Sequence, residues 1–193
     1  LGFTGLFQPF IFFTIAIIVF ITCFFLIIQN RYFDFKYTIQ SFRGYLASPY
    51  VVLILLFFVL LFYLSLYPIT DWDAISYHLP VAKEFVSQGK IAVIPSIRFP
   101  VNPQLIDSFF AIALIFNDPR FASLIQYAMA IVLFLLIYSF GKRFFNKEIG
   151  LFSALIFLSS PFVLKFAVIP YVEIGETLFW FSGFYAMCIW LNE

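Results

Sequence analysis

The sequence has little charge and little cysteine. Charged residues make up 11% of its 193 residues and the formal net charge is +1, whereas about a quarter of a typical soluble domain is charged. A nearly neutral chain offers no basic face to nucleic acid, so we expect no nucleic-acid partner. Cys23 and Cys188 both lie within apolar runs and form neither a disulfide framework nor a metal-ligand spacing.

Several sequence signatures are also missing. The chain contains no internal repeat, no low-complexity tract and no glycine-rich phosphate loop. No basic segment precedes the first apolar run, which is too long for the core of a signal peptide. Because the chain begins at Leu1 and ends within a helical pattern, we expect a fragment of a longer polytopic protein.

Apolar residues, by contrast, are abundant. They make up 64% of the chain, which contains 31 Phe, whereas soluble domains are about 45–50% apolar. A soluble fold of this size exposes much of its surface to water and could not hide this surplus. The composition therefore predicts an integral membrane protein whose Phe side chains face lipid.

The hydrophobic pattern predicts an all-α, polytopic membrane protein with about five transmembrane helices, because each spanning helix needs about 20 mostly apolar residues. The expected spans cover residues 9–28, 49–67, 119–140, 149–164 and 174–191. Pro161 interrupts the fourth of them. We expect residues 1–193 to form a single transmembrane domain surrounded by membrane lipid.

The Lys and Arg residues predict the orientation of these spans. The connectors at 29–48 and 141–148 are dense in Lys and Arg, whereas those at 68–118 and 165–173 are sparser in them and more acidic. Connectors rich in Lys and Arg stay in the cytoplasm. We therefore expect a protein of the cytoplasmic (plasma) membrane whose 68–118 loop is extracytoplasmic.

The 68–118 loop is expected to contain two interfacial helices. In the first, over 71–88, apolar residues recur at spacings of three and four, which is typical of one helical stripe. These residues are Trp72, Ile75, Leu79, Ala82 and Val86. Gly89 should end this helix and Pro80 should kink or divide it. The second helix, over 103–116, is too short to cross a membrane.

Two carboxylates, Asp71 and Asp73, directly follow the second span, where polar groups close to hydrocarbon often mark function. One interpretation is structural, because Thr70-x-x-Asp73 fits a capping box and the helix dipole favours acids in a first turn. The other makes one carboxylate a general base at the mouth of a membrane cavity. Residues two apart point about 200° away from each other on a helix, so both acids can face one substrate only if Asp71 precedes the helix.

Several short motifs surround this acidic turn. They are Asp-Ala-Ile-Ser-Tyr-His-Leu-Pro-Val-Ala-Lys at 73–83, Gly-Lys-Ile at 89–91, Phe-Pro at 99–100, Ser-Pro at 160–161 and Tyr-Val-Glu at 171–173. Together they resemble the C-type (GT-C) glycosyltransferases over most of residues 50–191, with 68–118 as the first external loop. These polyprenyl-phosphate-sugar-dependent enzymes include protein O-mannosyltransferases and the lipid A aminoarabinose transferase.

The resemblance implies roles for individual residues. In that family the catalytic base is an Asp four residues before a Tyr, which is the spacing of Asp73 and Tyr77. The family often has a second acid directly after the base, but here Ala74 stands there and the other acid is Asp71. Both Asp71 and Asp73 are therefore candidates for the base. The acid of the second external loop corresponds to Glu173.

The implied reaction transfers a sugar from a polyprenyl phosphate to an extracytoplasmic glycan, lipid or protein, with inversion at the anomeric carbon. The departing phosphate needs a cation, and the external candidates are Lys90, Arg98 and Lys165. Arg98 is preferred because a guanidinium can hold phosphate oxygens bidentately. Contact with lipid headgroups would explain Arg98 equally well.

Tyr77 and His78 are expected near the substrate, although each also has a structural interpretation. Aromatic side chains anchor helices at membrane interfaces, and a lone His is more often hydrogen-bonded within a fold than a ligand. His78 is the only histidine in the chain. Asp73 and Glu173 could join it around a divalent metal ion, but the spacing gives little support. We therefore assign no metal ligands and no cofactor besides the lipid-linked sugar donor, and a divalent metal stays an open alternative.

Two other functions compete with the transferase. A transporter or flippase module would place charged groups along a path within the spans, but the predicted spans are almost free of ionisable residues. A non-catalytic subunit of an envelope-assembly system fits the same composition.

Overall fold

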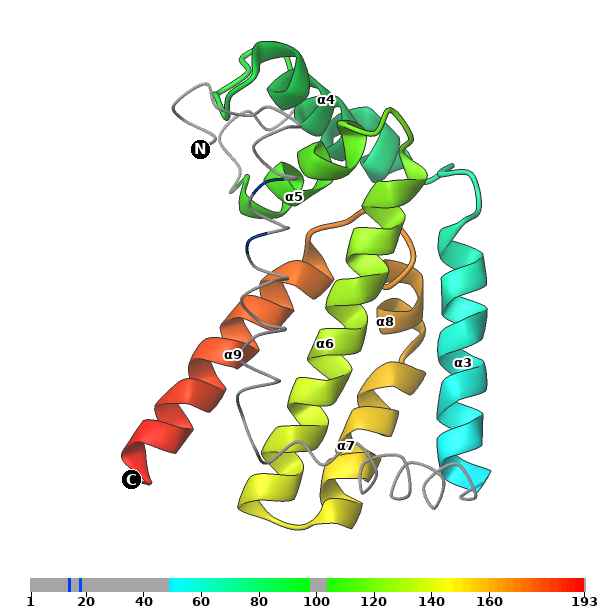
Figure 1. Ribbon diagram of the computed structural model, residues 1–193, viewed down its shortest axis with the longest axis vertical. Coiled ribbons are helices and arrows are strands. Elements are labelled where there is room, and N and C mark those ends of the chain that lie inside the picture. The colour runs from blue at the N-terminus through cyan, green and yellow to red at the C-terminus, as the bar shows by residue number, and fades with distance from the viewer. Residues whose placement is uncertain (1–13, 15–17, 19–48, 98–103, 193) are drawn as a thin grey trace.

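The computed structural model describes residues 14, 18, 49–97 and 104–192. This described part of the chain is helical and contains no β-strand (Figure 1), which confirms the predicted all-α class. The predicted span at 9–28, apart from residues 14 and 18, and the connector at 29–48 lie outside the described residues.

Three apolar helices correspond to predicted spans. They are α3 (Pro49–Ser65), α6 (Arg120–Phe144) and α9 (Glu173–Leu191). Pro49 suits the first turn of α3 because its missing N–H is not needed there. By length and composition, α6 and α9 could each cross a membrane, and α3 is a shorter apolar helix.

Pro161 divides the predicted fourth span. The first part, α7, covers Lys147–Ser159, and the second, α8, covers Pro161–Phe166. Between them Ser160 is extended, with a ψ of 127°. The division follows from the proline ring, which cannot continue a helix through its own backbone N.

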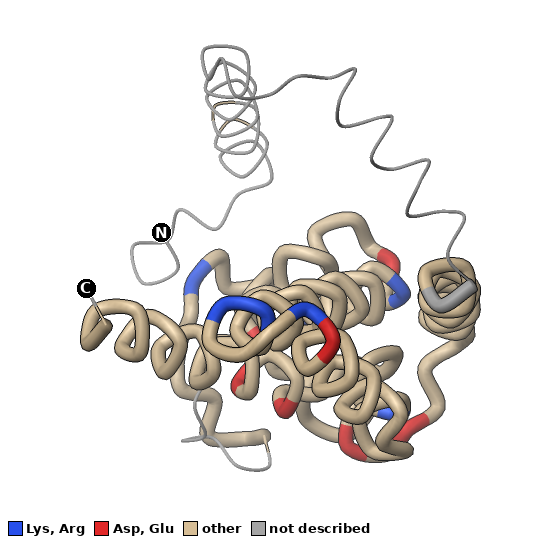
Figure 2. Tube along the Cα trace, turned by 90° about the horizontal axis from the view of Figure 1, so that it is seen from below, with Lys and Arg blue, Asp and Glu red and all other residues tan. Residues whose placement is uncertain are grey.

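α6 and α7 form an antiparallel hairpin whose turn carries Lys142, Arg143 and Lys147. Figure 2 looks at the bundle from the end where this turn lies. Gly141 and Gly150 allow the two helices to approach closely. A Cβ built on Gly150 would lie only 2.6 Å from the backbone O of Tyr138, and one built on Gly141 would lie 2.5 Å from the Cα of Gly150.

At the opposite end, three shorter helical segments lie across the bundle (Figure 1). The π-helix η2 (Ala74–His78) continues directly into α4 (Leu79–Gln88), and α5 covers Leu105–Leu114. Gly89 ends α4 as predicted, with a φ of 65° that favours glycine.

The predicted apolar stripe over 71–88 is not the face that packs against the rest of the protein. Trp72 and Ile75 are 60% and 51% exposed, whereas Ala82 is buried. The buried residues of this segment are Ala74, His78, Val81, Ala82 and Phe85. Positions 74, 78, 81 and 85 recur at spacings of three and four, so the buried face of this segment is helical but differs from the predicted stripe.

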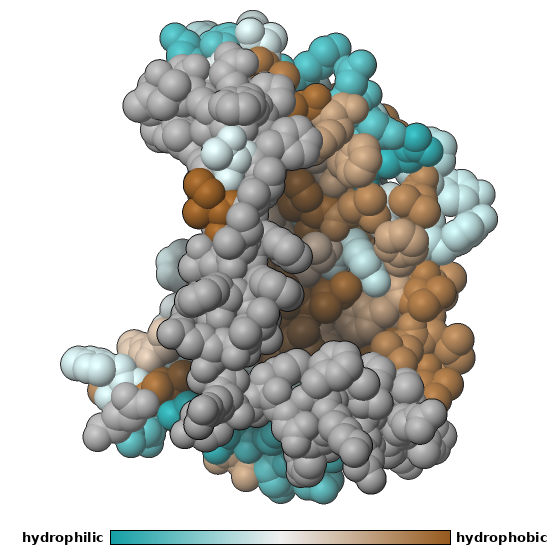
Figure 3. Space-filling view, in the orientation of Figure 1, coloured by the Kyte–Doolittle hydropathy of each residue, from teal (hydrophilic) through white to brown (hydrophobic). Residues whose placement is uncertain are grey.

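Buried apolar side chains form two cores. One lies around Phe85 and Phe110, where α4 packs on α5, and the other lies around Leu133 and Leu158, where α6 packs on α7. Many large apolar side chains remain exposed, among them Leu53, Leu56, Val59, Tyr63, Trp180 and Trp190. Figure 3 shows hydrophilic residues toward the top and at the bottom of the molecule, with hydrophobic residues between them. Such a surface is compatible with membrane association.

Candidate functional site

Two turns meet beside the upper end of the bundle. The first, over 66–73, links α3 to η2, and the second, over 167–172, links α8 to α9. The Tyr171 hydroxyl donates a hydrogen bond to Oδ1 of Asp71 and lies 3.4 Å from Oδ2 of Asp73. A contact between positions 100 residues apart thus joins the acidic turn to the second turn.

Lys165, in the last turn of α8, completes this arrangement. Its Nζ lies 2.9 Å from Oδ2 of Asp71 and 5.5 Å from the centroid of the Tyr171 ring. The Lys165 side chain is 48% exposed and the Asp71 side chain 20% exposed. We call Asp71, Asp73, Lys165 and Tyr171 the acid cluster.

The acid cluster shifts the pKa values of two of its members in opposite directions. Burial by itself raises the pKa of Asp71, but the hydrogen bond from Tyr171 and the ammonium of Lys165 together leave that pKa below its ordinary value. Burial raises the pKa of Tyr171, and the hydrogen bond to Asp71 and the charges of Asp71 and Asp73 raise it further. At neutral pH Asp71 is therefore ionised and Tyr171 protonated.

Asp71 also caps the helix that follows it. Its carboxylate accepts a hydrogen bond from the backbone N–H of Asp73, whose own φ and ψ of −67° and −41° are already helical. The capping contact therefore comes from Asp71, and the Asp73 side chain makes no capping hydrogen bond. Because Asp71 precedes the helix, both acids can reach the Tyr171 hydroxyl.

His78 and Asp107 form a second, buried pair beside the acid cluster. Nδ1 of His78 lies 2.8 Å from Oδ1 of Asp107, and the two side chains are 4% and 6% exposed. Nε2 of His78 is also buried and has no hydrogen-bond partner within the described part of the chain. The His78 ring centroid lies 5.7 Å from that of Tyr171 and 4.2 Å from that of Tyr77.

The other predicted site residues are placed differently. Glu173 opens α9 with an exposed side chain, and Lys90, directly after Gly89, is also exposed. Within residues 49–97 and 104–192, no hydrogen bond or ion pair joins either of them to the acid cluster. Arg98 lies outside the described residues. Tyr77 is half-buried against His78.

Two residues take roles that the sequence did not assign. The motif at 171–173 points to its acid, Glu173, whereas the contact with the acidic turn comes from Tyr171. Asp107 is the only charged residue of the apolar helix α5. A buried carboxylate needs a partner. A single acid in an apolar helix is therefore the sequence feature from which the His78–Asp107 pair could have been predicted.

The arrangement offers carboxylates that can accept a proton and an ammonium that can bind an anion. Asp73 has the weaker contacts of the two acids, and Lys165 is the half-exposed cation. Among the described residues, no group of three or more His, Cys, Asp and Glu side chains is placed to hold a metal ion.

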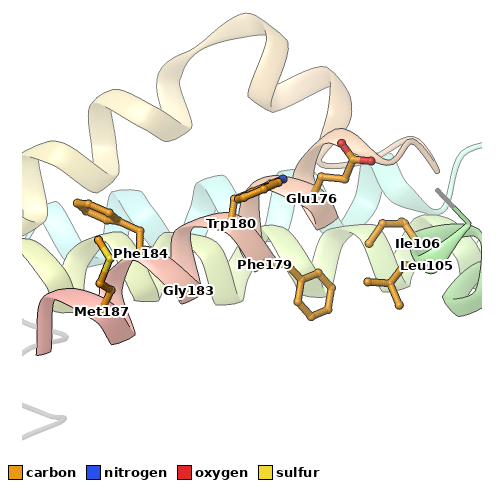
Figure 4. Close-up of a pocket in the computed structure, with 8 residues that line it drawn as sticks. All are labelled: Leu105, Ile106, Glu176, Phe179, Trp180, Gly183, Phe184 and Met187. Atoms are coloured by element: carbon orange, nitrogen blue, oxygen red, sulfur yellow. The ribbon is translucent and has the colours of Figure 1, made fainter. Parts of the chain in front are cut away.

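A largely apolar groove of about 790 Å³ begins beside α5 and runs along α9 (Figure 4). Its lining comprises Leu105, Ile106, Glu176, Phe179, Trp180, Gly183, Phe184 and Met187. The two helices touch at its upper end, where a Cβ built on Gly175 would lie 2.5 Å from Cδ1 of Ile106.

Comparisons with known proteins give one family and one curated relative. The model of the DUF1420 N-terminal domain matches residues 8–179. An uncharacterized protein of Shigella flexneri is 39% identical over 77 residues, which cover 39% of this chain and 39% of that protein. The match thus spans well under half of the relative's length. No solved structure matches the chain.

Proposed function

The chain belongs to the DUF1420 family, and we propose that it is part of a multi-pass membrane glycosyltransferase. It would transfer a sugar from a polyprenyl phosphate to a hydroxyl group of an extracytoplasmic glycan, lipid or protein. The observation that carries this proposal is the acid cluster, in which Asp71 and Asp73 meet Tyr171 and Lys165 at one end of a bundle of apolar helices.

The location of the acid cluster suits a donor that is embedded in lipid. The apolar bodies of α3, α6 and α9 carry their charged residues only in first or last turns, and the cluster lies in the turns beyond α3 and before α9. A polyprenyl-phosphate sugar has its tail in the leaflet and its scissile C1–O bond at headgroup level. The cluster would lie at that level if these helices span the membrane.

Asp73 is the better candidate for the general base. The Asp71 carboxylate already has three partners, namely the Tyr171 hydroxyl, the Lys165 ammonium and the N–H of Asp73, and its pKa lies below the ordinary value. A carboxylate stabilised in this way is a weak base. Asp73 is half-buried, and its 3.4 Å contact with Tyr171 leaves oxygen lone pairs for a substrate hydroxyl.

The reaction would proceed in one displacement. Asp73 takes the proton of the acceptor hydroxyl while that oxygen attacks C1 of the sugar from the side opposite the phosphate. The C1–O bond to phosphate breaks, its electron pair leaves with the polyprenyl phosphate, and the configuration at C1 is inverted. A positioned general base contributes about 10²–10⁴ in rate.

Lys165 would stabilise the leaving phosphate. Its ammonium is half-exposed at 2.9 Å from Asp71, so it can turn toward a phosphate oxygen while Tyr171 and the N–H of Asp73 still hold Asp71. Lys90 and Arg98 are further candidates for the same contact. Lys90 is not joined to the acid cluster within the described part of the chain, and Arg98 lies outside the described residues.

The test compares Asp73→Asn, Asp71→Asn and Asp118→Asn in the full-length protein in membranes. Asp118 is the matched control, because it is an acid at the start of α6 that pairs with Arg120 and not with the acid cluster. With labelled polyprenyl-phosphate sugars as donors, Asp73→Asn should lower transfer at least about 10²-fold. Donor binding should remain, and Asp118→Asn should transfer normally. Full transfer by both Asp73→Asn and Asp71→Asn would end the assignment.

The distribution of ionisable residues favours this enzyme over a transporter. α6 has Arg120 in its first turn and Lys142 and Arg143 in its last, and the acids of α9 lie in its first turn. A transport path that uses charged groups needs them deeper within its helices. Substrate flux across sealed vesicles without sugar transfer would favour the transporter.

A further inference from the structure

We infer that His78 and Asp107 are a positioning pair. Their contact preserves the turn of η2 that has an i→i+5 hydrogen bond, which we call the π-turn, and thereby directs Asp73 toward Tyr171. The inference rests on the proposed function in one respect, because it takes Asp73 as the general base. Neither residue of the pair touches the substrate in this role. The pair acts through the backbone that carries Asp73.

The π-turn changes which residues share a face with Asp73. The backbone N–H of Ile75 bonds to the carbonyl of Asp71 in the α-helical pattern, whereas the N–H of Leu79 bonds to the carbonyl of Ala74, five residues back. In an α-helix, residue 78 would be rotated about 140° from residue 73. With i→i+5 bonding, residues five apart lie nearly above one another.

Tyr171 shows that Asp73 and His78 share a face. Its hydroxyl lies 3.4 Å from Asp73, and its ring centroid lies 5.7 Å from that of His78. One side chain from the second turn therefore contacts both. If η2 became α-helical, Asp73 and His78 could no longer both face Tyr171.

The contact with Asp107 accounts for the closed π-turn. His78 is the last residue of η2, and its Nδ1 lies 2.8 Å from a carboxylate on α5, 29 positions away. With the carboxylate oxygen of Asp107 as acceptor, Nδ1 of His78 is the donor. π-turns are rare and often lie at functional sites, and this one is tied to a second helix by a buried, oriented hydrogen bond.

An apolar pair would pack α5 on η2 equally well. Buried polar pairs are often no more stabilising than apolar residues of the same volume, so packing alone does not explain His78 and Asp107. A hydrogen bond adds direction, since it fixes the rotation of the imidazole and with it the turn that ends at His78. This is the feature that a positioning role requires.

The experiment uses the full-length protein in nanodiscs and compares it with Asp107→Asn, His78→Gln and the double variant. Phe110→Leu is the control, because it reduces a fully buried side chain of α5 and leaves both His78 and Asp107 in place. Two measurements are made on each protein: transfer kinetics, and hydrogen exchange of the amides of η2 and α6. ¹⁵N-histidine labelling, with His78→Gln used to assign the signal, gives the Nδ1 and Nε2 signals of His78, which report its tautomer.

If the pair positions Asp73, Asp107→Asn should lower kcat roughly 10²-fold, because a misplacement of about 1 Å can cause such a loss. The KM for the donor should stay within twofold of that of the unmodified protein. His78→Gln should behave similarly, and the double variant should be no slower than the slower single variant. The amides of Ala74–His78 should exchange faster while those of α6 do not, and the protonated Nδ1 signal should be lost in Asp107→Asn.

The opposite results would overturn the inference. They are an unchanged kcat in Asp107→Asn, an equal loss of kcat in Phe110→Leu, or unchanged exchange of the η2 amides in Asp107→Asn. If the unmodified protein transfers no sugar, the proposed function fails instead. In that case the exchange and imidazole signals still decide whether the pair holds the π-turn.

Discussion

Replacing Tyr171 by Phe keeps the ring and removes the hydroxyl, so it isolates what that hydroxyl contributes to the acid cluster. The hydroxyl donates to the ionised Asp71 and lies 3.4 Å from Asp73. A hydrogen bond to a charged group contributes about 1.5–3 kcal/mol. Because the Asp71 side chain is 20% exposed and also contacts Lys165, water and the ammonium compensate in part. We expect the free energy of unfolding to fall by about 1.5 kcal/mol at pH 7.

The loss of unfolding free energy caused by Tyr171→Phe should become smaller as the pH falls. The hydroxyl helps to lower the pKa of Asp71 in the folded protein. A carboxyl whose pKa is depressed by folding stabilises the fold above its unfolded pKa, and this stabilisation is lost as the pH falls through the folded pKa. The difference between the unmodified protein and Tyr171→Phe should therefore be full at pH 7 and should shrink below about pH 4.

Tyr127→Phe is the matched control for this measurement. The Tyr127 hydroxyl donates at 3.0 Å to the backbone O of Phe58, which is uncharged, so its removal should cost about 0.5–1.5 kcal/mol at either pH. Unfolding in mixed detergent micelles, followed by Trp fluorescence at pH 7 and pH 3, gives both differences. The reasoning fails if Tyr171→Phe is as stable as the unmodified protein at pH 7, or if its loss at pH 3 is undiminished.

Two further substitutions test the hairpin and the cation. Gly150→Ala places a Cβ 2.6 Å from the backbone O of Tyr138, so α6 and α7 must separate, and the same unfolding titration should show a loss of about 1–3 kcal/mol. Gly183→Ala meets nothing within 4 Å and should be neutral or stabilising; equal losses in the two variants would contradict the close contact. Lys165→Met removes the ammonium beside Asp71 and should weaken binding of polyprenyl phosphate to nanodisc-embedded protein at least about tenfold. Unchanged affinity would exclude Lys165 as the phosphate contact.

The helices that can be predicted from the sequence are those set by local chemistry. α3 begins at Pro49 and α4 ends at Gly89, because each of these residues dictates its own backbone geometry. α6 extends beyond its predicted end at residue 140 to Phe144. The additional turn carries basic residues that interact favourably with the helix dipole, so the basic connector is shorter than expected.

The π-helix could not be predicted in this way. Pro80 signals an irregularity in the helix but not its form. The π-helical geometry depends on the contact of His78 with Asp107, 29 positions along the chain. The spacing of apolar residues does not predict that contact.

The candidate site could be predicted in part. Asp71 and Asp73 stand out because acids so close to an apolar span are rare, and the structure brings both to Tyr171. The choice between them depends on Lys165 and Tyr171, which reach the acidic turn only after α6, α7 and α8 have packed. A residue 100 positions away lies beyond any argument from helical spacing.

The extra residue in the turn of η2 has a consequence for the evolutionary record of this family. A wider turn is retained only where something offsets its strain, which here is the imidazole bound to the carboxylate of α5. Relatives that lack this couple should have shortened the segment by one residue, and an alignment would place a single gap between positions 73 and 78. The length of that segment in each relative would then indicate whether the relative has the His78–Asp107 pair.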